Sequence, residues 1–150
     1  MTNETIWCGP VGNGALMKLS VNHYLNVTVA ALAEATHFAD SHDLGRALFQ
    51  RAIMAGPMAS EIARVKLEQL VTADFEVRAA VTDVFASTRL IADAARGSGI
   101  ASPLLDLASD LYRETVEHGN GRRDMIAVID AIEARTRAHA DGQELGRAPS

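Results

Sequence analysis

Apolar residues occur on nearly every side of one long segment near the N-terminus. From about Gly14 to Asp40 the sequence predicts a single helix with few polar side chains in its middle. Its apolar positions are Leu16, Leu19, Val21, Leu25, Val27, Val29, Ala30, Leu32 and Ala33. A helix of this kind is buried against several neighbours. At ~1.5 Å per residue it extends about 40 Å, which suits a central strut or an interface.

Glycine and proline divide the rest of the chain into shorter helical segments. Apolar residues at helical spacing predict helices over about 44–55, 59–70, 77–96, 103–118 and 125–139. Ser102-Pro103 is a strong start signal, because it places an N-cap before a proline at the first helical position. Asp124 is positioned to cap the last helix.

The sequence therefore predicts an all-α fold of five or six helices around the long N-terminal helix. At most one short strand precedes that helix, in the apolar run Thr5–Cys8. We expect a strand-like lead-in and glycine turn over residues 1–13, and a helical substrate and dimerisation domain over 14–139. Residues 140–150 are expected to form a disordered tail. The helices show no sustained heptad register.

The overall composition is that of an ordinary globular domain. A length of 150 residues suits one domain or one half of a two-domain enzyme. The net charge of −5 and the scattered arginines argue against a nucleic-acid partner. No apolar run is long enough to cross a membrane. We expect a cytoplasmic protein, because the start lacks a secretory pattern and the single Cys8 cannot form an intramolecular disulfide.

The residues most informative about function lie where the long helix begins. Gly9, Gly12 and Gly14 lead into it, and Lys18 and Asn22 follow at a spacing of four, on one helix face. The helix dipole disfavours a cation one turn from the start, and burial would lower the pKa of Lys18 further. Such an amine can exchange a proton with a carbonyl or hydroxyl oxygen, while the Asn22 amide holds that oxygen. Lys18 is also one of only two lysines among fourteen basic residues.

Two other interpretations of these residues stay open. Lys18 can extend along the surface to water while Asn22 bonds a neighbouring helix. The glycines can also suggest a dinucleotide-binding loop, but that motif needs a βαβ unit, and the chain stays helical from Gly14 to about Asp40.

No metal is expected to bind. The five histidines include no pair at i,i+4 and no His-Glu-x-x-His pattern, so their spacing does not favour a zinc site. His23 follows Asn22 directly but points about 100° away on the helix, which favours a partly buried or interface position.

The opening Gly9-x-Val11-Gly12-x-Gly14-x-x-x-Lys18-x-x-x-Asn22 resembles the start of the C-terminal helical domain of the β-hydroxyacid dehydrogenases. This family includes 3-hydroxyisobutyrate dehydrogenase and is related to 6-phosphogluconate dehydrogenase. The resemblance covers about 6–138, with weaker matches at Phe75 to Asp83, Gly99 to Leu104, Tyr112, Gly119 to Gly121, and Asp124. It implies that Lys18 donates and accepts the proton while hydride passes to or from NAD or NADP. It also implies that Asn22 holds the substrate and that Gly12 and Gly14 shape the turn beneath it.

Two departures from the family pattern change what the resemblance implies. Thr82-Asp83-Val84 stands where the family usually has Lys-Asp-Leu, so one cationic contact in the active-site cleft is missing. The family's N-terminal nucleotide-binding domain is not in this sequence. We therefore expect a separately expressed domain or a gene remnant that is inactive alone. It would use NAD or NADP only if another chain supplies a nucleotide-binding domain.

The competing function class is a non-catalytic helical module that dimerises or binds a partner. A homodimer through the long helix is expected, because an apolar surface of this size usually finds a partner. In this interpretation a charge at Leu25 or Val29 breaks the association, and a change at Lys18 has little effect. A third possibility, suggested by Thr82, is a reductase that acts on imines.

Overall fold

The computed structural model describes residues 4–146 and confirms the all-α architecture. The α-helices in this range are α1 (Asn13–Ser41), α2 (Arg46–Met54), α3 (Glu61–Thr72), α4 (Val81–Gly97), α5 (Pro103–Thr115) and α6 (Ile129–Gly146). A π-helical turn, η1 (Val116–Asn120), follows α5, and a short 3-10 helix, η2 (Met125–Val128), leads into α6. The apolar run Thr5–Cys8 forms no strand; the one β-type pairing in the described range is an isolated bridge between Ala80 and Asp124.

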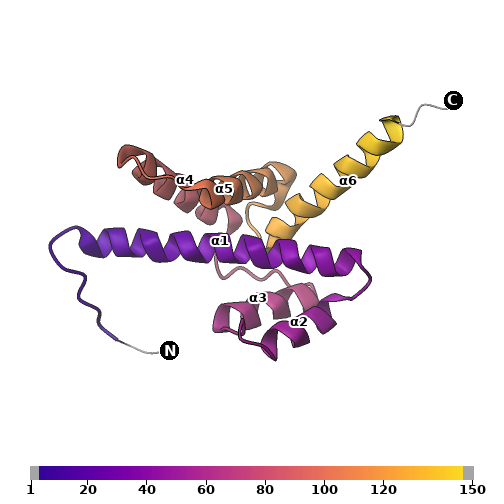
Figure 1. Ribbon diagram of the computed structural model, residues 1–150, viewed down its shortest axis with the longest axis horizontal. Coiled ribbons are helices and arrows are strands. Elements are labelled where there is room, and N and C mark those ends of the chain that lie inside the picture. The colour runs from indigo at the N-terminus through magenta and orange to yellow at the C-terminus, as the bar shows by residue number, and fades with distance from the viewer. Residues whose placement is uncertain (1–3, 147–150) are drawn as a thin grey trace.

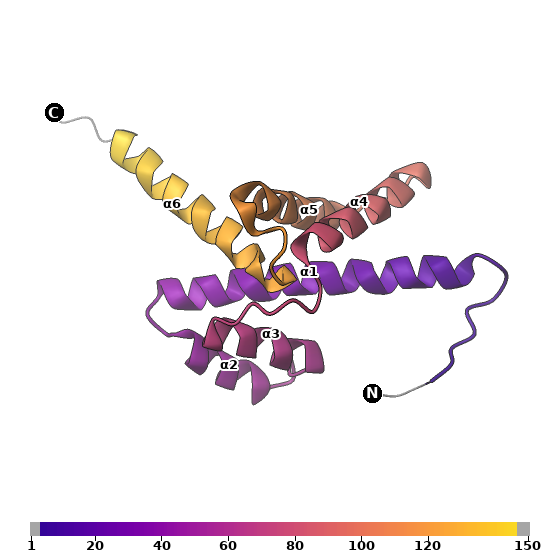
Figure 2. The same ribbon diagram turned by 180° about the vertical axis from the view of Figure 1, so that it is seen from behind.

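The long helix α1 runs through the middle of the molecule. Helices α4 and α5 lie on one side of it, and the α2–α3 hairpin lies on the other (Figure 1). The reverse view shows the segment between α3 and α4 crossing the middle of α1 (Figure 2). No helix among residues 4–146 combines the length and apolar character needed to cross a bilayer.

The core forms where α1 meets the η2–α6 segment. Every residue from Asp124 to Ile129 is buried, and the apolar ones pack with Val29 and Ala33 of α1. Val29 is completely buried and Leu25 packs against this core. A charge at Val29 would therefore disrupt the fold, so the expectation that it tests association is wrong. Because α1 is apolar on most sides, its pattern did not indicate which side faces inward.

Two helix boundaries differ from the sequence prediction for identifiable reasons. Helix α4 begins at Val81 rather than near 77, because the backbone N–H groups of Arg78 and Ala79 bond the Asp124 side chain at 3.0 and 3.2 Å. Helix α6 continues to Gly146, whereas a tail was expected from 140. Its last turns are exposed, and residues 147–150 lie outside the described range.

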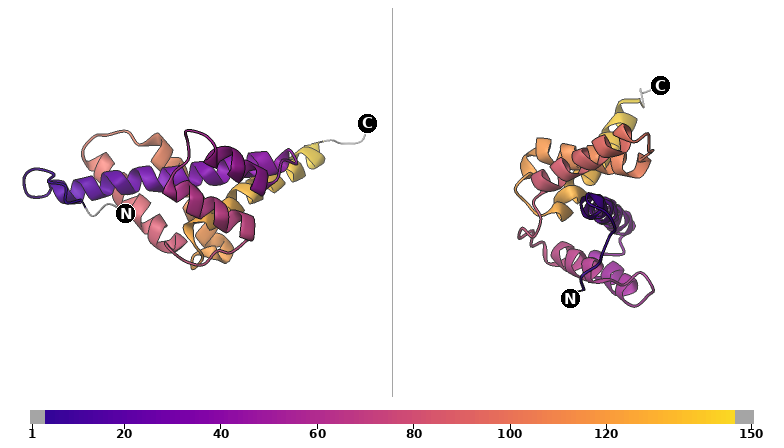
Figure 3. Two further views of the ribbon diagram at one scale, coloured as in Figure 1. Left: turned by 90° about the horizontal axis from the view of Figure 1, so that it is seen from below. Right: turned by 90° about the vertical axis from the view of Figure 1, so that its left-hand side faces the viewer.

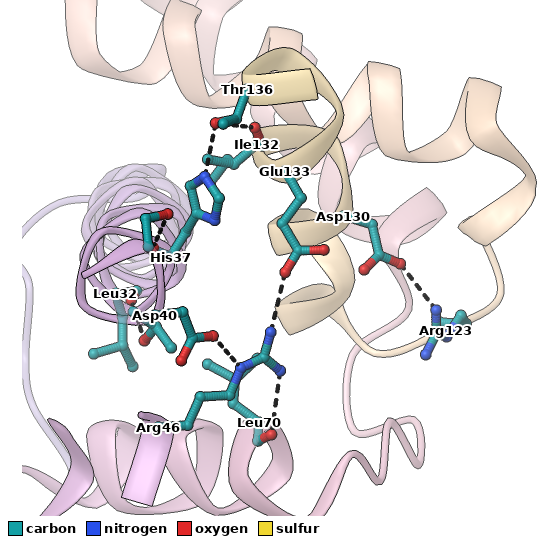
Figure 4. A network of polar contacts seen from close by, with 12 residues as sticks. Leu32, His37, Asp40, Arg46, Leu70, Arg123, Asp130, Ile132, Glu133 and Thr136 are labelled. Carbon is teal, nitrogen blue, oxygen red and sulfur yellow. Dashed lines mark hydrogen bonds and ion pairs between the residues drawn. The ribbon is translucent and has the colours of Figure 1, made fainter. Parts of the chain in front are cut away.

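Arg46 at the start of α2 joins three helices (Figure 4). Its guanidinium pairs with Asp40 of α1 at 2.6 Å and with Glu133 of α6 at 3.0 Å, and it donates to the Leu70 carbonyl of α3 at 3.3 Å. The connection into α2 turns sharply, with Asp43 at φ 59°. Arg46 therefore fixes the base of α6 and the α2–α3 hairpin against the C-terminal half of α1.

Candidate functional site

The glycine turn before α1 has the backbone geometry that its sequence suggests. Gly12 is the N-cap of α1 with φ 97°, a left-handed conformation that favours glycine. The turn is closed by Asn13, whose backbone N–H bonds the Pro10 carbonyl at 3.1 Å and whose side chain bonds the Cys8 carbonyl at 3.0 Å. Gly14 lies in the first turn of the helix, and a Cβ on Gly12 or Gly14 would meet nothing within 4 Å. The space above this turn is open.

Lys18 and Asn22 follow on one face of α1, as their spacing predicts. Lys18 is exposed and Asn22 is half-buried. Within residues 4–146 neither side chain takes part in a hydrogen bond or an ion pair. The dry environment that would help Lys18 to exchange a proton is thus not provided by the described residues, and it would have to come from a second domain covering this face.

One turn further along α1, Asn26 fixes the orientation of that face. The buried Asn26 amide donates to the Ser87 hydroxyl of α4 at 3.4 Å. Its backbone carbonyl accepts a 2.7 Å bond from the Tyr112 hydroxyl of α5. Burial raises the pKa of Tyr112, and the Asp124 carboxylate raises it further, so the hydroxyl stays a donor. These bonds hold α1 against α4 and α5.

Thr82 occupies the position where the resemblance expects a lysine. Its backbone N–H and its hydroxyl both donate to the Gly121 carbonyl, each at 2.9 Å. The approach is so close that a Cβ on Gly121 would lie 2.5 Å from the Thr82 hydroxyl oxygen. The Thr82 hydroxyl is therefore engaged in a structural bond, and the position supplies no cation.

The buried pair of Lys66 and Asp124 was not found from the sequence. The Lys66 ammonium lies 2.8 Å from an Asp124 carboxylate oxygen, with side chains 3% and 0% exposed. Lys66 also donates to Gln69 at 3.1 Å. A signal was present, because Lys66 lies among Ala63, Leu67 and Leu70 on the apolar side of α3.

Asp124 organises the loop that leads to Thr82. Besides Lys66, it accepts backbone N–H bonds from Arg78 and Ala79, and from Ile126 at 3.0 Å. Burial alone would raise the pKa of Asp124, but the Lys66 ammonium and the N–H groups of Ile126 and Arg78 lower it overall. The prediction that Asp124 caps the last helical segment is confirmed, since it caps η2.

Three of the weaker sequence matches lie in one structural unit, namely Phe75 to Asp83, Gly119 to Gly121, and Asp124. The Phe75 carbonyl accepts the Asp124 N–H at 3.3 Å, and the Arg123 guanidinium lies 4.1 Å from the centre of the Phe75 ring. Arg123 also pairs with Asp130 at 2.9 Å (Figure 4). This unit supports the start of α4 beside the middle of α1 (Figure 2).

The described residues do not form a cradle for a dinucleotide. The glycine turn follows an unpaired segment rather than a strand, and its first helical N–H bonds the chain's own Pro10 carbonyl. Residues 4–146 also contain no group of three or more His, Cys, Asp or Glu side chains placed to hold a metal ion.

Solved 3-hydroxyisobutyrate dehydrogenases contain the same arrangement of a long first helix, two flanking helix pairs and a buried η2 segment. A 3-hydroxyisobutyrate dehydrogenase from Salmonella typhimurium has the same fold, with a TM-score of 0.76 and 24% identity over 79% of this chain and 42% of that chain. Mycobacterium tuberculosis 3-hydroxyisobutyrate dehydrogenase, solved with L-serine, has a TM-score of 0.75 and 23% identity over 85% of this chain and 46% of that chain.

The family described as NAD-binding of NADP-dependent 3-hydroxyisobutyrate dehydrogenase matches residues 12–132, and the chain belongs to this family. The resemblance drawn from the glycine, lysine and asparagine opening is therefore confirmed. A curated relative, chloroplastic glyoxylate/succinic semialdehyde reductase 2 of Arabidopsis thaliana, is 24% identical over 134 residues. That match covers 89% of this chain but only 37% of the relative. The chain thus spans less than half the length of each of these three proteins.

Proposed function

We propose that this chain is the substrate-side domain of an NAD(P)-dependent oxidoreductase that acts on a hydroxyacid or a related carbonyl compound. The observation that carries the proposal is the open face of α1, where Lys18 and Asn22 lie one turn apart beyond the glycine turn. Membership of a family described as NAD-binding supports an NAD(P)-dependent oxidation or reduction.

Lys18 is the proposed acid and base. In the reductive direction its ammonium gives a proton to the carbonyl oxygen, and in the oxidative direction the neutral amine takes the hydroxyl proton. The Asn22 amide donates to the same oxygen and orients it. NAD(P), when bound, supplies or accepts the hydride at the carbon. Gly12 and Gly14 leave room for the substrate, because no atom other than those of their chain neighbours and the α1 backbone lies within 4 Å of the Cβ position of either residue.

The proposed site needs a nucleotide-binding domain to complete it. That domain would bring the cofactor and exclude water from Lys18. We expect no turnover by the isolated chain. We expect a substrate with few anionic groups, because Thr82 gives no positive charge where the family usually has one.

A chimera tests the proposal directly. The helical half of the Salmonella enzyme is replaced by this chain, and cofactor oxidation is followed with a panel of carbonyl acids and cyclic imines. We expect Lys18→Ala to reduce kcat about 10²–10⁴-fold without loss of helical circular dichroism. Lys18→Arg should be equally poor, since guanidinium does not titrate near neutral pH. Arg137→Ala on the exposed side of α6 is the matched control. An active chimera that tolerates Lys18→Ala would exclude the proposed role.

The second candidate is a non-catalytic helical module that dimerises or binds a partner. It is favoured by the large apolar side chains left exposed along α1. Self-association through α1 is part of both proposals, and the chimera separates them, because only the enzyme depends on Lys18.

A cytoplasmic location is also proposed, supported by the free Cys8, and cell fractionation would test it.

A further inference from the structure

The side of α1 that carries Lys18 and Asn22 continues into the core. Leu25 and Val29 follow these residues at intervals of three and four, so all four side chains point within about 60° of one another around the helix. Lys18 is exposed, Asn22 and Leu25 are half-buried, and Val29 is completely buried. Over about three turns the proposed catalytic face therefore passes from open solvent to the interior of the domain.

A pocket of about 400 Å³ borders this face at Leu25, and we name it the Leu25 pocket. Its walls come from α1, α3, the segment between α3 and α4, and η2, and its apolar lining consists of Leu25, Ile62, Val65, Ala79 and Met125. Viewed along α1, the segment between α3 and α4 passes on one side of that helix and joins the α2–α3 hairpin to α4 (Figure 3, right). The pocket thus lies about one turn beyond Asn22 on the same side of α1.

Two of the charged residues that line the Leu25 pocket are already paired. The Lys66 ammonium is matched by the Asp124 carboxylate at 2.8 Å and by the Gln69 side-chain oxygen at 3.1 Å. Lys66 therefore offers the pocket its alkyl stem but no net charge. Glu61, which is exposed, forms an ion pair with Arg64 on the same helix.

Arg78 is the remaining charged residue of the lining, and its charge is not balanced. Its backbone N–H is held by the Asp124 carboxylate at 3.0 Å, which fixes where the side chain starts. Its guanidinium is exposed, and within residues 4–146 it takes part in no ion pair or side-chain hydrogen bond. The bond from Arg64 lowers the pKa of the Glu61 carboxyl, and the charge of Arg78 lowers it further, so the Arg78 cation acts at the mouth of the pocket.

An apolar pocket with one surplus guanidinium at its mouth suits an apolar chain that carries a carboxylate. We propose that the Leu25 pocket binds the tail of the substrate, and that Arg78 holds a carboxylate at the end of that tail. The proposal rests on the proposed function, because the reacting carbonyl is the one placed at Lys18 and Asn22. A single carboxylate far from the reacting carbon also agrees with the missing cation at Thr82.

The length of α1 between the two positions sets the length of the substrate. Lys18 and Leu25 are about 10 Å apart along the helix axis, so a short hydroxyacid cannot reach both. The substrate class is therefore a longer ω-oxo acid, or the matching ω-hydroxy acid in the oxidative direction. In the reduction, the cofactor gives a hydride to the aldehyde carbon and Lys18 gives a proton to its oxygen, and the tail is unchanged.

Nuclear magnetic resonance titration of the full chain tests the pocket without turnover. The probes are straight-chain carboxylates from butanoate to octanoate, which lack the reacting carbonyl and report on the tail alone. We expect shifts in the amide signals of Leu25, Ile62 and Ala79, and each added methylene should lower Kd about threefold. Hexanol should bind about fivefold more weakly than hexanoate, because it has no charge for Arg78. A Kd that does not change with chain length, or shifts confined to other residues, would overturn the proposal.

Two variants separate the charge from the apolar walls. Arg78→Gln should raise the Kd of hexanoate about fivefold and leave that of hexanol unchanged. Val65→Phe fills part of the pocket and should weaken both probes. Arg137→Gln, on the exposed side of α6, is the matched control and should change neither. Circular dichroism verifies that each variant folds. Hexanoate binding that keeps its full affinity in both Arg78→Gln and Val65→Phe would refute the assignment.

The chimera described above distinguishes failure of this inference from failure of the proposed function. With ω-oxo acids of increasing length, kcat/KM should rise to the length that reaches Arg78, and Arg78→Gln should abolish this preference mainly through KM. An active chimera that needs Lys18 but shows no preference for length would overturn the tail pocket alone. The binding titrations do not depend on Lys18, so they stand or fall separately from the enzymatic proposal.

Discussion

Lys66 and Asp124 form a buried ion pair, with nitrogen and oxygen 2.8 Å apart and the two residues 58 positions apart in the sequence. The pair connects the inner side of α3 to the residue that caps η2. Removing one member of a buried ion pair leaves the other charge desolvated and uncompensated.

Lys66→Met should therefore lower the free energy of unfolding by about 3–5 kcal/mol. Urea denaturation followed by circular dichroism at pH 7 measures the change. Lys18→Met is a matched control, because it removes the only other lysine from an exposed position. A loss of equal size in both variants would contradict the role assigned to the buried pair.

The deficit of Lys66→Met should shrink as the pH falls. The folded state lowers the pKa of Asp124, so this residue contributes stability above its unfolded pKa of about 3.9, and the contribution is lost as the pH falls through the folded value. Without Lys66 the folded pKa is higher, so the variant binds its proton at a higher pH than the parent. Urea titrations at pH 7, 5, 4 and 3 should show the two stabilities converging. A deficit that grows on acidification would contradict this sign.

Arg46→Ala should destabilise the chain by about 1–3 kcal/mol, because it breaks charged hydrogen bonds to Asp40 and Glu133 and one to the Leu70 carbonyl. The site is about one quarter exposed, which favours the lower half of that range. Arg64→Ala, which removes an exposed pair with Glu61 inside α3, is the control and should change the midpoint much less. Thermal and urea midpoints of the two variants make the comparison.

Gly121→Ala should destabilise the fold by about 1–3 kcal/mol, because the new Cβ would lie 2.5 Å from the Thr82 hydroxyl oxygen. Thr82→Ala removes that oxygen, although it also loses the bond to the Gly121 carbonyl. The double variant should therefore lose less free energy of unfolding than the two single variants lose in sum. A double-mutant cycle from urea unfolding measures this coupling, and strict additivity would show that the close approach is relieved in another way.

Sequence reasoning performed best where local signals decide the structure. Glycine and proline marked the ends of most helices, and the Gly12 turn and the Asp124 cap were identified from residue type alone. The polar stretch after 139 was interpreted as a tail, but alanine, glutamate and glutamine are strong helix formers, and α6 continues to Gly146.

Long-range relationships were beyond the sequence pattern. Lys66 and Asp124 meet only through the tertiary fold, and the start of α4 depends on the same carboxylate. The sequence could not indicate the inward side of α1, because the helix carries apolar residues on most of its sides. For this reason Val29, which is completely buried, was assigned to an interface. The site residues Lys18 and Asn22 came from spacing and resemblance, and their roles stay predictions.

The free end of α6 has a practical consequence for experiments on this protein. Beyond Thr136 the helix is exposed on all sides and projects away from the other helices (Figure 1). The opposite end of the chain runs through Cys8 and Pro10 directly into the glycine turn before α1, which carries Lys18. Purification tags, fluorophores and surface anchors should therefore be attached at the C-terminus, because a tag at the N-terminus would occupy the space beside the glycine turn that the proposed nucleotide-binding domain needs.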